Sequence, residues 1–185
     1  MKKMMIGIVS LSIALGLIGI GIYFKQNDGY EFKYQEDVID VIKDDLQMSE
    51  TELTYLNEKH YKKDGLHLYM IALENINNYY FYIFEEKSNQ RYQKYYHFSY
   101  SKSDELKVIH DAKSQLTIAC GSNEAGKIAG FEICRAGAGI RTIDDNAYII
   151  EVFDNNDIDI LPVDDQKEIV NDYTMRRTYI NEGEQ

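Results

Sequence analysis

Histidine is the residue type here most suited to binding a metal or moving a proton, and the chain has four: His60, His67, His97 and His110. No HxxxH or HExxH pattern occurs, so the sequence does not support a zinc site on a helix. A hairpin turn at Asp64-Gly65 would make His60 and His67 diagonal neighbours on one sheet face, beside Glu58 and Tyr69. This cluster could form a metal site or a polar ligand pocket. A solvated sheet end is the favoured interpretation, because binding needs converging ligands.

The two cysteines, Cys120 and Cys134, could close a loop by a disulfide worth about 3 kcal/mol. If 116–120 and 128–134 were instead the arms of one hairpin, Cys134 would lie roughly 23 Å along the strand from the position opposite Cys120. A disulfide tolerates at most about 7 Å between Cα atoms. The two structures therefore exclude each other, and separate buried thiols are favoured over the disulfide.

Arg135 and Arg141 flank the small residues 136–139, whose backbone N–H groups could form an anion site with help from the two guanidinium groups. A turn with solvated arginines is the simpler interpretation. Ten of the 23 aromatic residues lie in 79–100 and could form a platform for a saccharide or a peptide. Their strand alternation favours core positions instead.

Other reactive patterns fail on their spacing. A calcium loop that starts at Asn155 would place Ile160 where glycine is required and Gln166 where a bidentate glutamate is required. No GxSxG, SxxK or Cys-His signature occurs. The sequence therefore predicts no catalytic residue, no cofactor and no metal ion.

Residues 4–24 form an uncharged run of 21 residues, long enough as a helix to cross a hydrocarbon core of roughly 30 Å. Lys2 and Lys3 precede this run, so the positive-inside bias predicts a single-pass signal-anchor with residues 1–24 as cytoplasmic stub and span. A cleaved signal peptide is the alternative. The rest of the chain would lie outside the cell membrane.

The formal net charge is −11, which becomes −13 without Lys2 and Lys3. Nucleic-acid binding needs clustered Lys and Arg, so this class is excluded. Besides the membrane, the expected partners are a protein, a peptide or a wall saccharide.

One α+β domain is expected over 35–180, after a linker at 25–34 and before a frayed tail at 181–185. Apolar spacing predicts a helix over 35–47. Runs rich in strand formers predict a four-stranded antiparallel meander over 52–61, 66–75, 78–86 and 91–100.

Two-residue turns at Asn77-Asn78 and Ser88-Asn89 would set Leu73 opposite Tyr82, and Tyr82 opposite Tyr95. Both faces of the meander are apolar, so the helix should cover one face and the second half of the chain the other. That half is expected to be β-rich, with a terminal helix over 164–177. Residues 103–116 could be strand or helix.

A helix followed by an antiparallel meander resembles the element order of cystatin-like modules, which occur behind single membrane anchors in Gram-positive bacteria. The resemblance concerns element order alone, so it implies no functional residue. We therefore expect a membrane-anchored, non-catalytic binding or accessory domain at a bacterial cell surface. The alternatives are an enzyme or metal-binding domain that uses the cluster around His60 and His67, or a scaffold subunit of a membrane complex.

Overall fold

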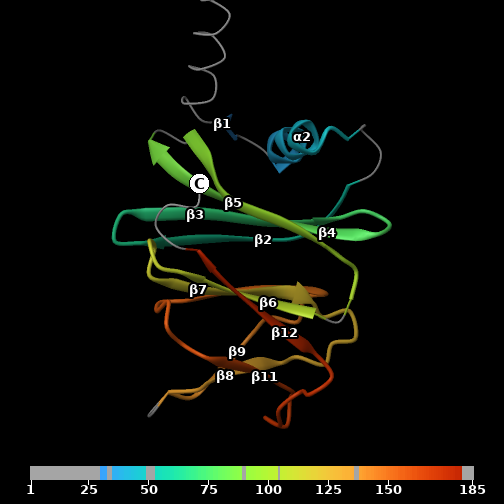
Figure 1. Ribbon diagram of the computed structural model, residues 1–185, viewed down its shortest axis with the longest axis vertical. Coiled ribbons are helices and arrows are strands. Elements are labelled where there is room, and N and C mark those ends of the chain that lie inside the picture. Colours follow the sequence, from blue (N-terminus) through green and yellow to red (C-terminus); the bar gives the residue numbers. More distant parts are fainter. Residues whose placement is uncertain are drawn as a thin grey trace, which may run out of the picture.

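The structure is a computed structural model that describes residues 30–32, 35–48, 53–88, 91–103, 105–135 and 138–180. Strands make up 58% of these residues, in three sheets stacked below one helix (Figure 1). The elements are β1 (Tyr30–Glu31), α2 (Gln35–Leu46), β2 (Thr54–Lys63), β3 (Leu66–Glu74), β4 (Asn78–Ser88), β5 (Arg91–Ser101), β6 (Glu105–Asp111), β7 (Leu116–Ser122), β8 (Gly130–Ile133), β9 (Ile140–Thr142), β10 (Tyr148–Phe153), β11 (Ile160–Val163) and β12 (Thr174–Ile180).

The first sheet, sheet A, has the strand order β1-β5-β4-β3-β2 and contains the predicted meander. The β2–β3 turn is confirmed at Asp64-Gly65, where both residues have positive φ, 50° and 83°. This is the conformation that a type I′ turn requires. The β3–β4 turn differs from the prediction, because the Asn75 side chain accepts hydrogen bonds from the backbone N–H groups of Asn77 and Asn78. The turn thus lies one residue earlier, with the Asn75 N–H donating to the Asn78 carbonyl oxygen at 2.9 Å, and it sets Leu73 opposite Tyr80 rather than Tyr82.

Two register irregularities interrupt the side-chain alternation in sheet A, and Tyr82 lies opposite His97 rather than opposite Tyr95 as predicted. One lies between Tyr55 and Asn57 in β2, and the other lies where Phe84 pairs with Lys94. A β-bulge adds a residue to one strand and so reverses the alternation beyond it. Leu56 and Tyr95 consequently pack toward the second half of the chain instead of toward the helix.

Helix α2 covers the upper face of sheet A (Figure 1). Its apolar stripe buries Val38 and Ile42, as the spacing predicts. These side chains pack on a cluster of buried residues from β3 and β4: Tyr69, Ile71, Leu73, Tyr80, Tyr82 and Phe84. The C-terminal end of the helix is held by Asp45, which accepts hydrogen bonds from Tyr82 Oη at 2.9 Å and Lys94 Nζ at 2.6 Å.

The lower face of sheet A packs on sheet B, whose strand order is β10-β7-β6-β12. Sheet B packs in turn on the small sheet C, with the order β11-β8-β9. The strands β6, β7 and β10 are buried along their whole length. Because apolar layers cover both of their faces, β7 and β10 have mostly apolar sequences, whereas β6 also buries Glu105, Lys107, His110 and Asp111.

The predicted α+β class is wrong, because the described part of the chain is mostly sheet with a single short helix. The terminal helix predicted for 164–177 is also absent. Residues 164–173 form a looped segment in which Ile169 bridges to Val163, and β12 follows it, parallel to β6. From this loop, Val170 and Tyr173 pack against the core between sheets B and C, whereas Ile169 is exposed. Residues 105–111 form a strand, one of the two alternatives for that segment.

Within the ranges that the structure describes, no helix combines the length and the apolar character needed to cross a membrane. The single-pass anchor and the membrane location predicted from the sequence are corrected accordingly. Residues 4–24, on which that prediction was based, lie outside the described residues.

Candidate functional site

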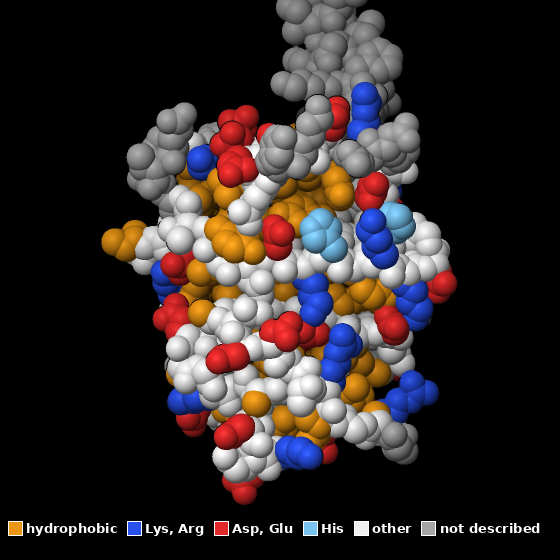
Figure 2. Space-filling model, turned by 180° about the vertical axis from the view of Figure 1, so that it is seen from behind, with side chains coloured by type: hydrophobic (Ala, Val, Ile, Leu, Met, Phe, Trp, Pro, Cys, Tyr) orange, Lys and Arg blue, Asp and Glu red, His pale blue; other side chains and the backbone are white. Residues whose placement is uncertain are grey.

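A hollow of about 200 Å³ lies between the start of α2 and the upper face of sheet A. Its lining combines aromatic rings with a carboxylate and an imidazole: Phe32, Gln35, Val38, Glu58, His60, Tyr69 and Tyr92. Three of these, Glu58, His60 and Tyr69, belong to the cluster predicted from the sequence. Figure 2 shows this side of the molecule, where hydrophobic side chains lie beside acidic and histidine side chains in the upper part.

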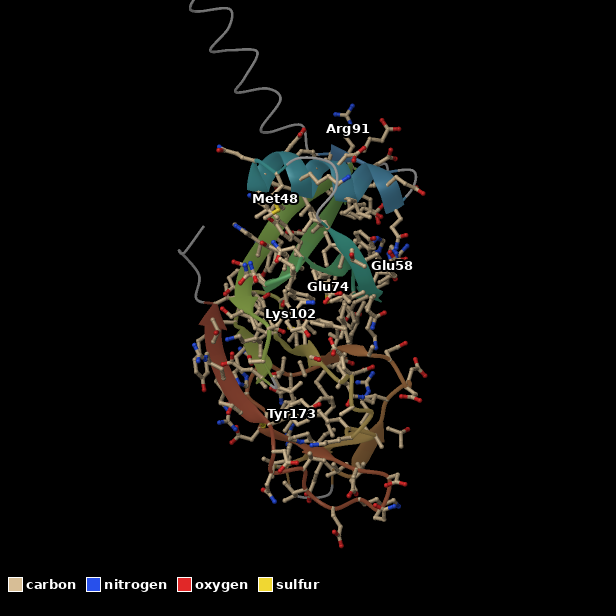
Figure 3. All side chains as sticks on the ribbon, turned by 90° about the vertical axis from the view of Figure 1, so that its right-hand side faces the viewer. Met48, Glu58, Glu74, Arg91, Lys102 and Tyr173 are labelled. Carbon is tan, nitrogen blue, oxygen red and sulfur yellow. The ribbon has the colours of Figure 1, made fainter. Side chains whose placement is uncertain are left out.

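Strand alternation places these side chains on one face. Glu58 and His60 are two residues apart on β2, and His60 pairs with Tyr69 of β3 across the confirmed hairpin. Successive side chains on a strand point to opposite faces, so these three all point toward α2. Glu58 lies on the outer side of sheet A, below one end of the helix (Figure 3). The hollow therefore lies at the edge of the sheet, not at its centre.

Aromatic rings form the apolar walls of the hollow. The Phe32 and Tyr92 rings stack with centroids 5.1 Å apart, and the Tyr69 ring meets Tyr92 edge-on at 6.1 Å. The His60 ring lies 4.5 Å from Tyr69. The faces of aromatic rings carry partial negative charge and attract cations.

The polar group of the hollow is the Glu58 carboxylate. Its Oε2 atom accepts a hydrogen bond from Tyr69 Oη at 2.6 Å and one from Gln35 Nε2 at 3.3 Å. Burial, followed by this hydrogen bond to a carboxylate, raises the pKa of Tyr69 above its ordinary value, so the phenol remains a donor. Two neutral donors thus orient a half-buried carboxylate.

Among the described residues, no lysine or arginine side chain pairs with Glu58 within 4 Å, and the same holds for Asp111, whose partners are neutral donors. Comparable carboxylates have a lysine ammonium at 2.6 Å: Asp45 with Lys94, Glu85 with Lys87, and Glu151 with Lys59. A desolvated carboxylate without a counter-charge is unfavourable. Glu58 therefore presents an uncompensated negative charge to the hollow.

A larger hollow, of about 320 Å³, opens at the seam between sheets A and B, but the carboxylates of its Glu85 and Asp154 are already paired with lysines. Asp154 accepts a hydrogen bond from Tyr61 Oη at 2.5 Å and lies 3.0 Å from Lys63 Nζ. These two contacts lower the pKa of Asp154. The hollow at Glu58 is thus the better candidate site, because its carboxylate still lacks a counter-charge.

The fourth residue of the predicted cluster, His67, lies on the same face but outside this hollow. Its Nδ1 atom is 3.0 Å from Glu86 Oε2. Among the described residues no group of three or more metal-ligating side chains converges. His60 and His67 are therefore diagonal neighbours in the β2–β3 pair, as predicted, but they do not form a metal site with a third ligand.

The structure uses Arg141 for packing. Its guanidinium donates to the Val152 carbonyl oxygen at 2.7 Å, lies 3.4 Å from Glu151 and covers the Phe153 ring. Arg135 is exposed, and residues 136–137 of the predicted anion loop lie outside the described residues. The Arg141 guanidinium therefore already contacts β10, and these contacts compete with anion binding.

The aromatic residues of 79–84 are buried, in agreement with the core interpretation, whereas those of 92–100 are only partly buried. Tyr92 contributes to the hollow but was not singled out from the sequence, and neither were Phe32 and Gln35. Tyr92 faces Glu86 across the β4–β5 pair, so a correct register for that pair would have indicated its face. Phe32 precedes the helix, and no local pattern indicates where it packs.

Both cysteines are free thiols, in different sheets. Cys120 is buried in β7, whereas Cys134 is exposed just beyond β8, unlike the prediction that both would be buried. Burial raises the pKa of the Cys120 thiol far above its ordinary value, which disfavours the reactive thiolate.

We expect DTNB to label one thiol in the native protein and both thiols in denaturant, because only Cys134 is accessible. The absorbance at 412 nm after DTNB treatment measures the number of labelled thiols. Cys134→Ser should abolish native labelling and leave the labelling of Cys120 in denaturant. Two reactive thiols in the native state, or none in denaturant without a reductant, would contradict this arrangement.

Comparison of the chain with protein-family models, with curated proteins and with solved structures found no match.

Proposed function

We propose that this protein is a non-catalytic binding domain whose hollow under α2 accepts an organic cation. The observation that carries the proposal is the Glu58 carboxylate, oriented by Tyr69 and Gln35, which has no cationic partner among the described residues. A ligand ammonium would supply the missing charge and could donate a charge-assisted hydrogen bond.

The aromatic lining supports the same ligand class. Phe32, Tyr69 and Tyr92 surround the space near the carboxylate, and their rings can contact both an alkyl chain and the ammonium attached to it. The net charge of −11 would also attract cations from a distance. A metal-binding function is less well supported, because the residues that the structure describes provide no converging third ligand.

We expect n-butylammonium to bind with a Kd on the order of 1 mM, and the uncharged n-butanol, of the same chain length, to bind far more weakly. Amide chemical-shift changes in NMR spectra would measure both affinities. Glu58→Gln keeps the side-chain size and an acceptor for the Tyr69 hydroxyl but removes the charge. Because a hydrogen bond to a charged group contributes about 1.5–3 kcal/mol, this variant should weaken butylammonium binding by roughly 10- to 100-fold.

The matched control is Glu132→Gln, which removes one negative charge from an exposed position in sheet C. Its affinity for butylammonium should equal that of the unmodified protein. Equal losses in the two variants would show that net charge alone attracts the cation. Equal binding of butylammonium and butanol would contradict the proposal.

A further inference from the structure

The hollow at Glu58 lies beside an unpaired strand edge. Strand β2 is the last strand of sheet A, and among the described strands it forms a ladder with β3 only. Its outer side therefore has no strand partner among the described residues, although the Glu58 N–H already donates to Asn57 Oδ1 at 2.8 Å. Strand β10, the last strand of sheet B, lies on the same side, since Asn57 Nδ2 donates to the Tyr148 carbonyl oxygen at 2.6 Å.

A second hollow, of about 180 Å³, lies between these two edges. Its lining is mostly polar and includes the partly exposed Ile143: Asn57, Glu58, Lys59, Ile143, Asp144, Asn146, Ile149, Ile150 and Glu151. Glu58 lines both this hollow and the one under α2. The two hollows thus adjoin one short stretch of β2, one toward α2 and the other toward sheet B.

The side chains of β2 show how a strand placed beside it would be oriented. Glu58 and His60 point toward α2, while Asn57, Lys59 and Tyr61 point toward sheet B. A strand that paired with this edge would continue the alternation. One of its side chains would enter the aromatic hollow, and the adjacent side chain would enter the second hollow.

We propose that the natural occupant is an extended peptide segment of a partner protein, paired with the edge of β2, with a lysine or arginine beside an apolar residue. This inference rests on the proposed function, because the basic side chain would occupy the cation hollow at Glu58. The apolar neighbour would contact Ile143, the partly exposed isoleucine of the second hollow. Backbone hydrogen bonds to β2 would provide affinity, and the two hollows would provide specificity.

The charges along this edge favour a basic segment over an acidic one. Glu58, Asp144 and Glu151 are the carboxylates at the two hollows. The nearby cations, Lys59 and Arg141, both face Glu151, at 2.6 and 3.4 Å. Glu58 is left without a cation among the described residues, so a basic segment would complete the charge pairing.

The test compares n-butylammonium with the peptide acetyl-Ser-Val-Lys-Val-Ser-amide on the full-length protein, with affinities measured by NMR titration. We expect the peptide to bind at least about tenfold more tightly, because it adds strand pairing and a second contact. The amide signals of Asn57, Lys59 and Tyr61 should shift, whereas that of Phe131 in sheet C should remain unchanged.

Two N-methylated peptides provide the matched control for strand pairing. Every second N–H of a paired strand points to its neighbour, so methylation of either the lysine nitrogen or the following valine nitrogen should abolish the gain, and methylation of the other should preserve it. If the peptide binds no better than butylammonium, or if neither methylation matters, strand pairing is refuted while the proposed function stands. If butylammonium itself does not bind, the proposed function fails as well.

Discussion

Gly121→Ala should lower the free energy of unfolding by about 2–3 kcal/mol, because β6 and β7 approach too closely at this position for a side chain. Gly121 lies in the central strand β7, between Leu106 of β6 and Ile149 of β10. A Cβ atom there would lie 2.6 Å from the Glu105 carbonyl oxygen and 2.9 Å from Leu106 Cδ2. The carbonyl oxygen belongs to the backbone, so relief of the clash would require separating two buried strands.

The measurement for Gly121→Ala is urea unfolding followed by circular dichroism. Gly139→Ala is the matched control, because a Cβ atom there meets no atom within 4 Å and the backbone φ is not positive. This control should change the free energy of unfolding by less than about 0.5 kcal/mol. Similar stabilities for the two variants would show that β6 and β7 are not packed as closely as described.

Ile42→Ala should lower the free energy of unfolding by about 2–4 kcal/mol, since deletion of a buried isoleucine side chain leaves a cavity. Ile42 is fully buried between α2 and sheet A. Among the described elements α2 is the cover of this face, so loosening it would expose aromatic surface. Because the start of α2 also forms one wall of the cation hollow, butylammonium binding should weaken in parallel.

Thermal and urea unfolding would measure the stability of Ile42→Ala, and NMR titration would measure its affinity for butylammonium. Asp44→Ala is the control on the same helix, because Asp44 is exposed and alanine is a good helix former. It should leave both quantities nearly unchanged. A loss of stability without any loss of affinity would show that α2 does not form the wall of the hollow.

Part of the candidate site was predictable because it depends on local geometry. The Asp64-Gly65 turn accepts positive φ at both positions, which aligns His60 with Tyr69 and places Glu58 on the same face. The helical stripe of Val38 and Ile42 likewise predicted a helix that covers a sheet. In both cases residues close in sequence determine the outcome.

Other features depend on partners distant in sequence. Two bulges turn Leu56 and Tyr95 toward sheet B. They follow from the packing between sheets, and the alternation of apolar residues within one strand does not indicate them. The segment 164–173 was predicted to start a helix, yet it forms a loop from which Val170 and Tyr173 pack against the core between sheets B and C. Tertiary packing overrides weak local propensity in such segments.

The sequence by itself determined one hairpin, one amphipathic helix and the shared face of Glu58, His60 and Tyr69, because turn chemistry and side-chain periodicity act over a few residues. Only the tertiary structure decided that the chain is mostly sheet and that Phe32, Gln35 and Tyr92 close a hollow around Glu58. Only the tertiary structure also left that carboxylate without a cationic partner among the described residues. Counter-charges and cavity walls come from distant strands, and their positions are set by how the sheets stack.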